Sequence, residues 1–166
     1  MSFNELIVNG GFETGSFPPW IPYNATITTL FKHSGIFAAQ LDGTSEDAFV
    51  SQFVSADAGQ RLEFLVSVAK AGNQPNPIIA LVIAYYDAAL NFIGQGLNVI
   101  IEPSFLPLAD ENDWLEIYNT TEPTPAGTAM AQVFIGKIGQ AGTSDVIVDD
   151  VSLLISEAAA GATGAT

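Results

Sequence analysis

Apolar and polar residues alternate with a period of two along much of this chain. In the segment RLEFLVSVA, residues 61–69, every even-numbered residue is apolar, and arginine, glutamate and serine lie between them. Successive side chains of a β-strand point to opposite faces, so this pattern predicts a strand with one buried face. No window of the sequence has the spacing of an amphipathic helix.

Nine further segments have strand-like composition, and clusters of Gly, Pro, Asn, Asp and Ser separate them. These segments are Glu5–Val8, Ala25–Phe31, Ile36–Leu41, Ala48–Val54, Ile78–Tyr86, Leu97–Ile101, Trp114–Tyr118, Ala129–Lys137 and Asp145–Leu154. About ten short strands at this spacing are typical of an antiparallel β-sandwich. The sequence therefore predicts an all-β fold, specifically a jelly roll, over residues 1–155.

One predicted strand is apolar on both faces. Ile78–Tyr86 contains no charged residue. It is either a central strand whose outer face is covered by a loop, or part of a subunit interface that includes Ile78 and Val82. Leu65 also points outward in its own strand and is expected to extend such an interface.

Composition excludes several classes of function. The chain has 18 acidic residues, 4 basic residues and a net charge of −14, so binding to nucleic acid or to an anionic membrane is not expected. Cysteine is absent and His33 is the single histidine, which excludes disulfides and multi-histidine metal sites. No pair of carboxylates is marked as catalytic, and we predict that the chain is not an enzyme.

The two ends of the sequence carry further signals. The first residues lack the basic and apolar regions of a secretory signal, and no apolar run reaches the length of about 18 residues that a membrane span needs. The last segment, residues 156–166, ends in two Gly-X-Y triplets at Gly161–Thr166. Such triplets are found in collagen, where only glycine fits the axis of the triple helix, but a linker of small residues looks similar.

Three motifs resemble the jelly-roll carbohydrate-binding modules of the xylan- and glucan-binding type. They are the N-G-G-F-E stretch at Asn9–Glu13, followed by Trp20; the H-S-G stretch at His33–Gly35; and the D-D-V stretch at Asp149–Val151. Trp114 is similar to a tryptophan late in those modules. The resemblance covers most of the chain and implies, as one alternative function, the recognition of a polysaccharide.

The whole chain also resembles the NTTRR type of N-terminal domain, which precedes collagen-like repeats in proteins of spore-forming bacteria. The matching segments are N-G-G-F-E-T-G near the start, Phe64–Lys70, Ala84–Asp87, Trp114–Tyr118 and Val148–Val151. This resemblance implies a spore-surface or exosporium location without a signal peptide, with secretion or the cell surface as the alternative. It also implies a structural domain that anchors or oligomerises, as a homotrimer or filament, with itself or other spore-surface proteins.

The resemblance to carbohydrate-binding modules further implies a structural Ca²⁺ ion. Its ligands would be Glu13, the region Lys32–Ser34 with Ser34 itself, and Asp149. Ca²⁺ takes 6–8 oxygen ligands, which carboxylates distant in sequence can supply together.

Strict alternation places Asp149 on the same face as Ile147, Val151 and Leu153. A carboxylate on an apolar face needs a metal or a hydrogen-bond partner. The alternative to calcium is that Asp149 accepts hydrogen bonds from the backbone or from Lys32.

A sugar site requires exposed aromatic rings. Most aromatic residues lie within apolar alternation and are expected in the core, as are Trp20 and Trp114 from the resemblance. The candidates for exposed rings are Tyr23, Tyr86, Phe92 and Tyr118, although nothing in the sequence places them on one groove.

Overall fold

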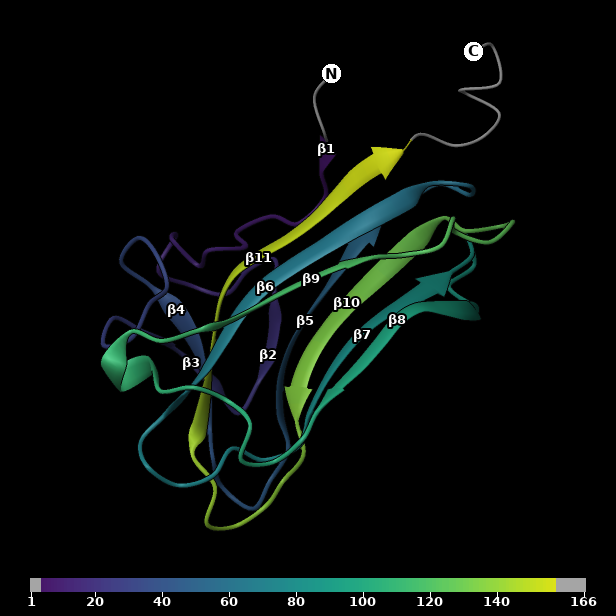
Figure 1. Ribbon diagram of the computed structural model, residues 1–166. Helices are drawn as coiled ribbons and strands as arrows, with labels where there is room; N and C mark the ends of the chain where they lie inside the picture. Colours follow the sequence, from purple (N-terminus) through teal and green to yellow (C-terminus); the bar gives the residue numbers. More distant parts are fainter. Residues whose placement is uncertain (1–3, 158–166) are drawn as a thin grey trace.

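The computed structural model describes residues 4–157 and consists of two β-sheets packed face to face (Figure 1). The predicted tail triplets at Gly161–Thr166 lie outside the described residues. The strands are β1 (Asn4–Glu5), β2 (Ile21–Tyr23), β3 (Ala25–Thr28), β4 (Ala38–Leu41), β5 (Ala48–Ser55), β6 (Arg61–Ala71), β7 (Ile79–Tyr86), β8 (Phe92–Ile101), β9 (Leu115–Thr120), β10 (Met130–Lys137) and β11 (Asp145–Glu157). Between β8 and β9 lies η1, a short 3-10 helix at Ala109–Glu111.

One sheet has six strands and the other has five. The six-stranded sheet has the order β3-β4-β11-β6-β9, with β1 also paired to β11, and the five-stranded sheet has the order β2-β5-β10-β7-β8. Every pair of neighbouring strands is antiparallel. The predicted all-β jelly-roll sandwich is therefore confirmed. Within residues 4–157, no helix is long and apolar enough to cross a membrane.

The main hydrophobic core lies between the two sheets. It includes the even-numbered residues of β6 that the alternation predicted as buried, and Phe12 and Trp20, whose rings lie 5.5 Å apart, close one end of it. A second, smaller apolar cluster lies on the outer face of the six-stranded sheet. There Ala38, Ala69 and Ile147 are covered by Phe31, Trp114 and the residue Ala109 of η1.

The boundaries of several strands differ from the predictions. β2 was not predicted, because Pro22 lies at its centre and a proline is tolerated only in an edge strand. β8 begins at Phe92 rather than Leu97, since its two glycines obscure the alternation. β11 continues to Glu157, two residues beyond the predicted end of the domain at residue 155.

A β-bulge in β11 changes which face Asp149 occupies. The pairing with β6 shifts register between Asp149 and Ser152, and Asp150 has a positive φ of 51°. Because the extra residue reverses the alternation, Val151 and Leu153 point into the main core, whereas Ile147 and Asp149 point to the outer face. The prediction that Asp149 shares a face with Val151 and Leu153 is therefore wrong.

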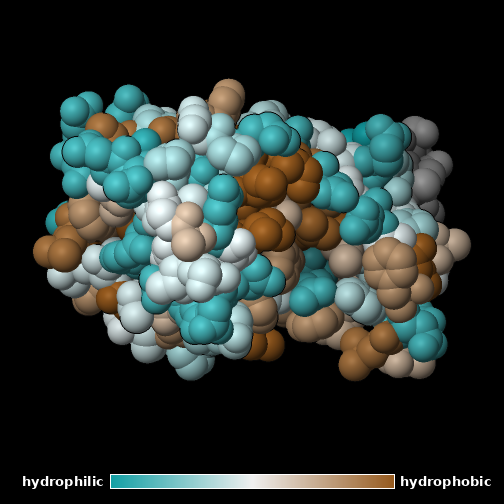
Figure 2. Space-filling model, turned by 90° about the horizontal axis from the view of Figure 1, so that it is seen from below, coloured by the Kyte–Doolittle hydropathy of each residue, from teal (hydrophilic) through white to brown (hydrophobic). Residues whose placement is uncertain are grey.

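The surface is a mixture of apolar and hydrophilic areas. Seen from the lower end of Figure 1, apolar residues gather in a patch near the middle of the surface, among hydrophilic ones (Figure 2). The predicted interface residues do not form one patch. Val82 lies on the outer face of the five-stranded sheet and Leu65 on the outer face of the six-stranded sheet, so the whole sandwich separates them.

Candidate functional site

The outer face of the five-stranded sheet carries six aromatic side chains, and we call this surface the aromatic face. It arises because β5, β7 and β10 place apolar residues on both of their faces, and only one face is needed for the core. Strand register groups the rings at two ends of the sheet. The six aromatic residues are Tyr23, Phe49, Phe53, Tyr86, Phe92 and Phe134.

At one end of the aromatic face, three rings pack side by side. The Tyr23 and Phe49 rings lie 5.5 Å apart with an interplanar angle of 24°, and the Phe49 and Phe134 rings lie 5.1 Å apart. A cavity of about 210 Å³ adjoins this group and is lined by the same three rings together with Gly136, Ile138 and the two charged residues Asp47 and Lys137. The missing side chain of Gly136 makes room for the Phe134 ring, since a Cβ there would lie 2.7 Å from two of its carbons.

At the other end, the Tyr86 ring lies between two further rings. Its centroid is 5.5 Å from that of Phe53 and 6.0 Å from that of Phe92. Phe92 is 58% exposed, although it lies in a strand. Apolar rings that remain in water on a folded protein are typical of surfaces that bind a ligand or a partner.

Polar side chains lie between the two aromatic groups. The Tyr86 hydroxyl donates a hydrogen bond of 3.1 Å to Oε1 of Gln132, and Nε2 of Gln132 donates one of 2.9 Å to the Ser51 hydroxyl. This chain crosses β7, β10 and β5. It holds the Gln132 amide in a fixed orientation between the rings.

The strands of the aromatic face carry little charge, although the exposed Asp47, which precedes β5, lines the cavity beside the rings. Lys137 is the single charged residue in β2, β5, β7, β8 and β10, and it is only 2% exposed. Its ammonium group donates a hydrogen bond of 2.7 Å to the carbonyl oxygen of Thr44. Burial lowers the pKa of Lys137, and nearby acidic residues, Asp42 first among them, oppose that shift.

The structure unites three of the four aromatic candidates. Tyr23, Tyr86 and Phe92 all lie on the aromatic face, whereas Tyr118 lies on β9 of the other sheet, where its hydroxyl donates a hydrogen bond of 2.8 Å to Glu63. Phe49, Phe53, Phe134 and Gln132 also lie on this face, and local sequence pattern does not identify them as site residues. Alternation within β5 and β10 places these four residues on one face of the sheet. Because both faces of these strands carry apolar residues, the sequence does not show which face is the outer one.

The predicted calcium ligand Asp149 is completely buried on the outer face of the six-stranded sheet. Its Oδ2 accepts hydrogen bonds from the backbone N–H of His33 (2.8 Å) and Ser34 (3.2 Å), and Oδ1 accepts one from Asp150 (2.7 Å). Burial raises the pKa of Asp149 to about 6, and these N–H groups oppose the shift. Lys32 donates to Thr29 instead, so the backbone supplies the partners.

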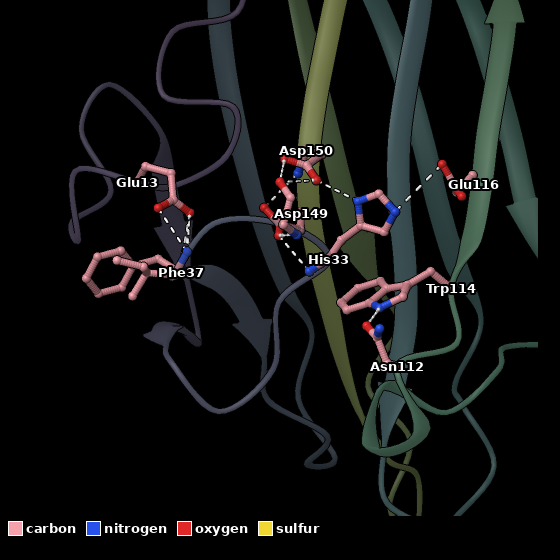
Figure 3. Close-up of polar contacts among 10 residues, drawn as sticks. Glu13, His33, Phe37, Asn112, Trp114, Glu116, Asp149 and Asp150 are labelled. Carbon is pink, nitrogen blue, oxygen red and sulfur yellow. Dashed lines mark hydrogen bonds and ion pairs between the residues drawn. The ribbon is translucent and has the colours of Figure 1, made fainter.

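The predicted ligand Glu13 lies on the other side of the loop that contains Ser34 (Figure 3). Its carboxylate accepts hydrogen bonds of 3.0–3.1 Å from the backbone N–H groups of Ile36 and Phe37. The structure thus brings Ser34 to Asp149, whereas Glu13 binds further along the same loop. Among residues 4–157, no three acidic or histidine side chains converge in a way that could hold a metal ion.

His33 fastens the same loop across three strands of the six-stranded sheet. Its Nδ1 lies 2.6 Å from Oδ2 of Asp150 on β11, and its Nε2 lies 3.7 Å from Glu116 on β9 (Figure 3). The Trp114 ring packs edge-on against it, with centroids 5.5 Å apart. Burial lowers the pKa of His33, but the hydrogen bond and charge of Asp150, with Glu116 and Asp149, outweigh it and raise the pKa above 6.5.

Comparisons of the sequence find no family model that matches and no curated protein that matches. Comparisons of the structure find carbohydrate-binding modules. A "Family 16 Carbohydrate Binding Module-2" superposes with a TM-score of 0.66 at 18% identity, covering 89% of this chain and 98% of that one. TmCBM61, solved with β-1,4-galactotriose, gives a TM-score of 0.62 at 19% identity and covers 90% and 97%.

Two further similar structures show how widely this fold is used. The CBM22-1 xylan-binding domain of Paenibacillus barcinonensis Xyn10C gives a TM-score of 0.65 at 15% identity, covering 95% of this chain and 98% of that one. The Stig cyclase Fisc of Fischerella sp. TAU gives 0.64 at 17% identity, covering 95% and 100%. These likenesses establish that the chain has the jelly-roll fold of carbohydrate-binding modules.

Proposed function

We propose that this chain is a non-enzymatic binding module that recognises an uncharged polysaccharide on its aromatic face. The observation that carries the proposal is the aromatic face itself: two groups of rings, with a fixed amide between them. Sugar rings stack their apolar faces on aromatic rings, and their hydroxyls hydrogen-bond to amide and hydroxyl groups. The solved neighbours whose names mention xylan and galactotriose support the same class of ligand.

The charge distribution supports an uncharged ligand. A cationic polymer would bind where the acidic residues lie, and an acidic polymer needs basic side chains that the aromatic face lacks. Within residues 4–157, Lys137 is the single basic residue in the strands of the five-stranded sheet and it is buried, and Asp47 is the single acidic residue that lines the cavity.

Isothermal titration with neutral oligosaccharides, beginning with xylo- and β-1,4-galacto-oligosaccharides, tests the proposal. Tyr86→Ala should weaken binding about tenfold or more, because buried aromatic anchors dominate such interfaces. Tyr118→Ala is the matched control, since it removes the same side chain from the opposite sheet, where Tyr118 is exposed. Equal losses in both variants, or no binding to any neutral glycan, would contradict the proposal.

Calcium at the Ser34 loop is a second proposal. The raised pKa of Asp149 supports it, because a buried carboxylate gains from a neighbouring cation. The oxygens of both Asp149 and Glu13 face backbone N–H groups, so a cation would have to replace some of these hydrogen bonds. We expect millimolar Ca²⁺ to raise the melting temperature above that in EGTA, and Asp149→Asn to remove the difference. Identical melting curves for the unaltered chain in Ca²⁺ and in EGTA would refute calcium binding.

That this chain forms the structural head of a collagen-like spore-surface protein stays a prediction. It depends on Gly161–Thr166, which lie outside the described residues, and on the resemblance of the sequence. Mass measurement of a chain that carries additional Gly-X-Y triplets tests it, with a trimer expected.

A further inference from the structure

The free edge of the five-stranded sheet at β8 differs from the other sheet edges. The terminal strands of the two sheets are β2, β3, β8 and β9. β2 has three residues with Pro22 at its centre, β3 has four residues, and β9 carries Glu116. Short length, proline and charge are the means by which proteins prevent edge strands from pairing with other chains. β8 has ten residues, none of which is charged or proline.

The hydrogen-bonding groups at this edge follow from the strand register. The N–H of Ile138 donates to the carbonyl of Ile78, so the even-numbered residues of β7 bond to β10. Antiparallel pairing alternates, and the odd-numbered residues of β7 therefore bond to β8, where Leu81 pairs with Val99. The N–H and C=O groups of Asn98 and Ile100 consequently point away from the sheet.

Only part of β8 is suitable for regular pairing. The two register irregularities fall between residues 92 and 97, and bulges of this kind twist an edge away from a partner. Leu97–Ile101 is regular and has the sequence LNVII, which is rich in β-branched residues. Ile100 is 50% exposed, and the exposed side chains of Leu90, Phe92 and Phe105 lie near the ends of the strand.

We propose that Leu97–Ile101 pairs antiparallel with the same segment of a second copy, across a two-fold axis at Val99. Asn98 then lies opposite Ile100 of the second copy, and each donates to the carbonyl of the other. Under a two-fold axis at Val99, the outward N–H and C=O groups of this segment pair with the same groups of a second copy. This self-pairing favours a second copy over an unrelated peptide as the partner. In a chain of net charge −14, an uncharged edge is also where two copies repel each other least.

The expected dimer is reversible, because the contact is short, and it does not depend on glycan binding. Multi-angle light scattering over a concentration series should show the mass rising from 17.4 kDa toward twice that value. Asn98→Pro should keep the chain monomeric, since proline removes an outward N–H without breaking the ladder to β7. Ile100→Lys, which leaves the backbone intact, should do the same if the proline variant does not fold.

Thr120→Pro is the matched control. Thr121 donates to Leu62, so the N–H of Thr120 points outward from β9, and this variant should dimerise like the unaltered chain. Hydrogen exchange should slow at Asn98 and Ile100 as the protein concentration rises.

Three results would overturn the proposal. The first is a monomer at every concentration. The second is a dimer or trimer whose mass is unchanged in both Asn98→Pro and Ile100→Lys. The third is slower hydrogen exchange at Asn98 and Ile100 when an unrelated peptide is added, while the chain itself stays monomeric.

Discussion

Two glycines in β8 provide a sharp test of how this strand packs on the core. A Cβ on Gly96 would lie 2.1 Å from the hydroxyl oxygen of Tyr85 and 2.5 Å from its Cζ, whereas a Cβ on Gly94 would meet nothing within 4 Å. Tyr85 is 2% exposed, so its ring has no free space into which to move. Gly96→Ala must therefore separate β8 from the ring by more than 1 Å, and overpacking of this kind costs about 1–3 kcal/mol.

Gly94→Ala is the matched control, because it changes the same residue type in the same strand. Replacing a strand glycine by alanine gains about 0.5–1 kcal/mol when space is free, so this variant should be as stable as the unaltered chain or slightly more stable. Urea denaturation followed by circular dichroism should place Gly96→Ala about 1–3 kcal/mol below Gly94→Ala. Equal stability of the two alanine variants would refute the packing argument.

The hydroxyl of Tyr85 adds an internal check. It is buried and makes no hydrogen bond of good geometry within the described part of the chain. Tyr85→Phe alone should therefore be neutral or stabilising. In a Gly96→Ala chain, adding Tyr85→Phe should restore part of the lost stability, because it removes the oxygen atom nearest to the new Cβ and leaves the ring in place. No recovery would mean that the clash involves another contact.

Three further predictions concern charge and the aromatic face. Burial raises the pKa of Asp149 from 3.8 to about 6, so the folded state holds its proton more tightly. The contribution of Asp149 to stability should be full below about pH 4 and fall by up to about 3 kcal/mol as pH rises through 6. Urea titrations in EGTA should therefore show a smaller loss of stability over this pH range for Asp149→Asn than for the unaltered chain. Gly136→Ala displaces the Phe134 ring on the surface, so it should weaken glycan binding in calorimetry while its urea midpoint changes little. Lys137→Met removes the hydrogen bond to Thr44 and should lower stability by about 1–3 kcal/mol in the same urea assay, and an unchanged midpoint would contradict that role.

Local pattern predicted the fold well where one face of a strand is buried and the other is polar. β6 follows the alternation from Arg61 to Val68, and its even-numbered side chains in that stretch form part of the core. The pattern failed where both faces are apolar, because periodicity cannot tell a covered face from a functional one. Phe49 and Phe134 were therefore assigned to the core, although both rings lie on the aromatic face.

Predictions about residues far apart in the sequence failed where a bulge or the assignment of strands to sheets decided the outcome, because the alternation along one strand contains neither. The positive φ of Asp150 bulges β11 and reverses the side of every later residue, so a single backbone torsion moved Asp149 relative to Val151. Leu65 and Val82 both point outward from their strands. Only the assignment of β6 and β7 to different sheets shows that they lie on opposite sides of the molecule.

The amino-acid sequence alone determined the strand content, the absence of cysteine chemistry and a strongly acidic net charge, because these follow from composition and from the period of two along a single strand. The tertiary structure decided which strands are neighbours, and hence that Tyr23, Tyr86 and Phe92 share one face of the molecule while Tyr118 lies on the other. The physical reason is that a strand specifies the direction of its side chains relative to its own backbone. Which sheet and which edge it occupies depends on long-range pairing with other strands.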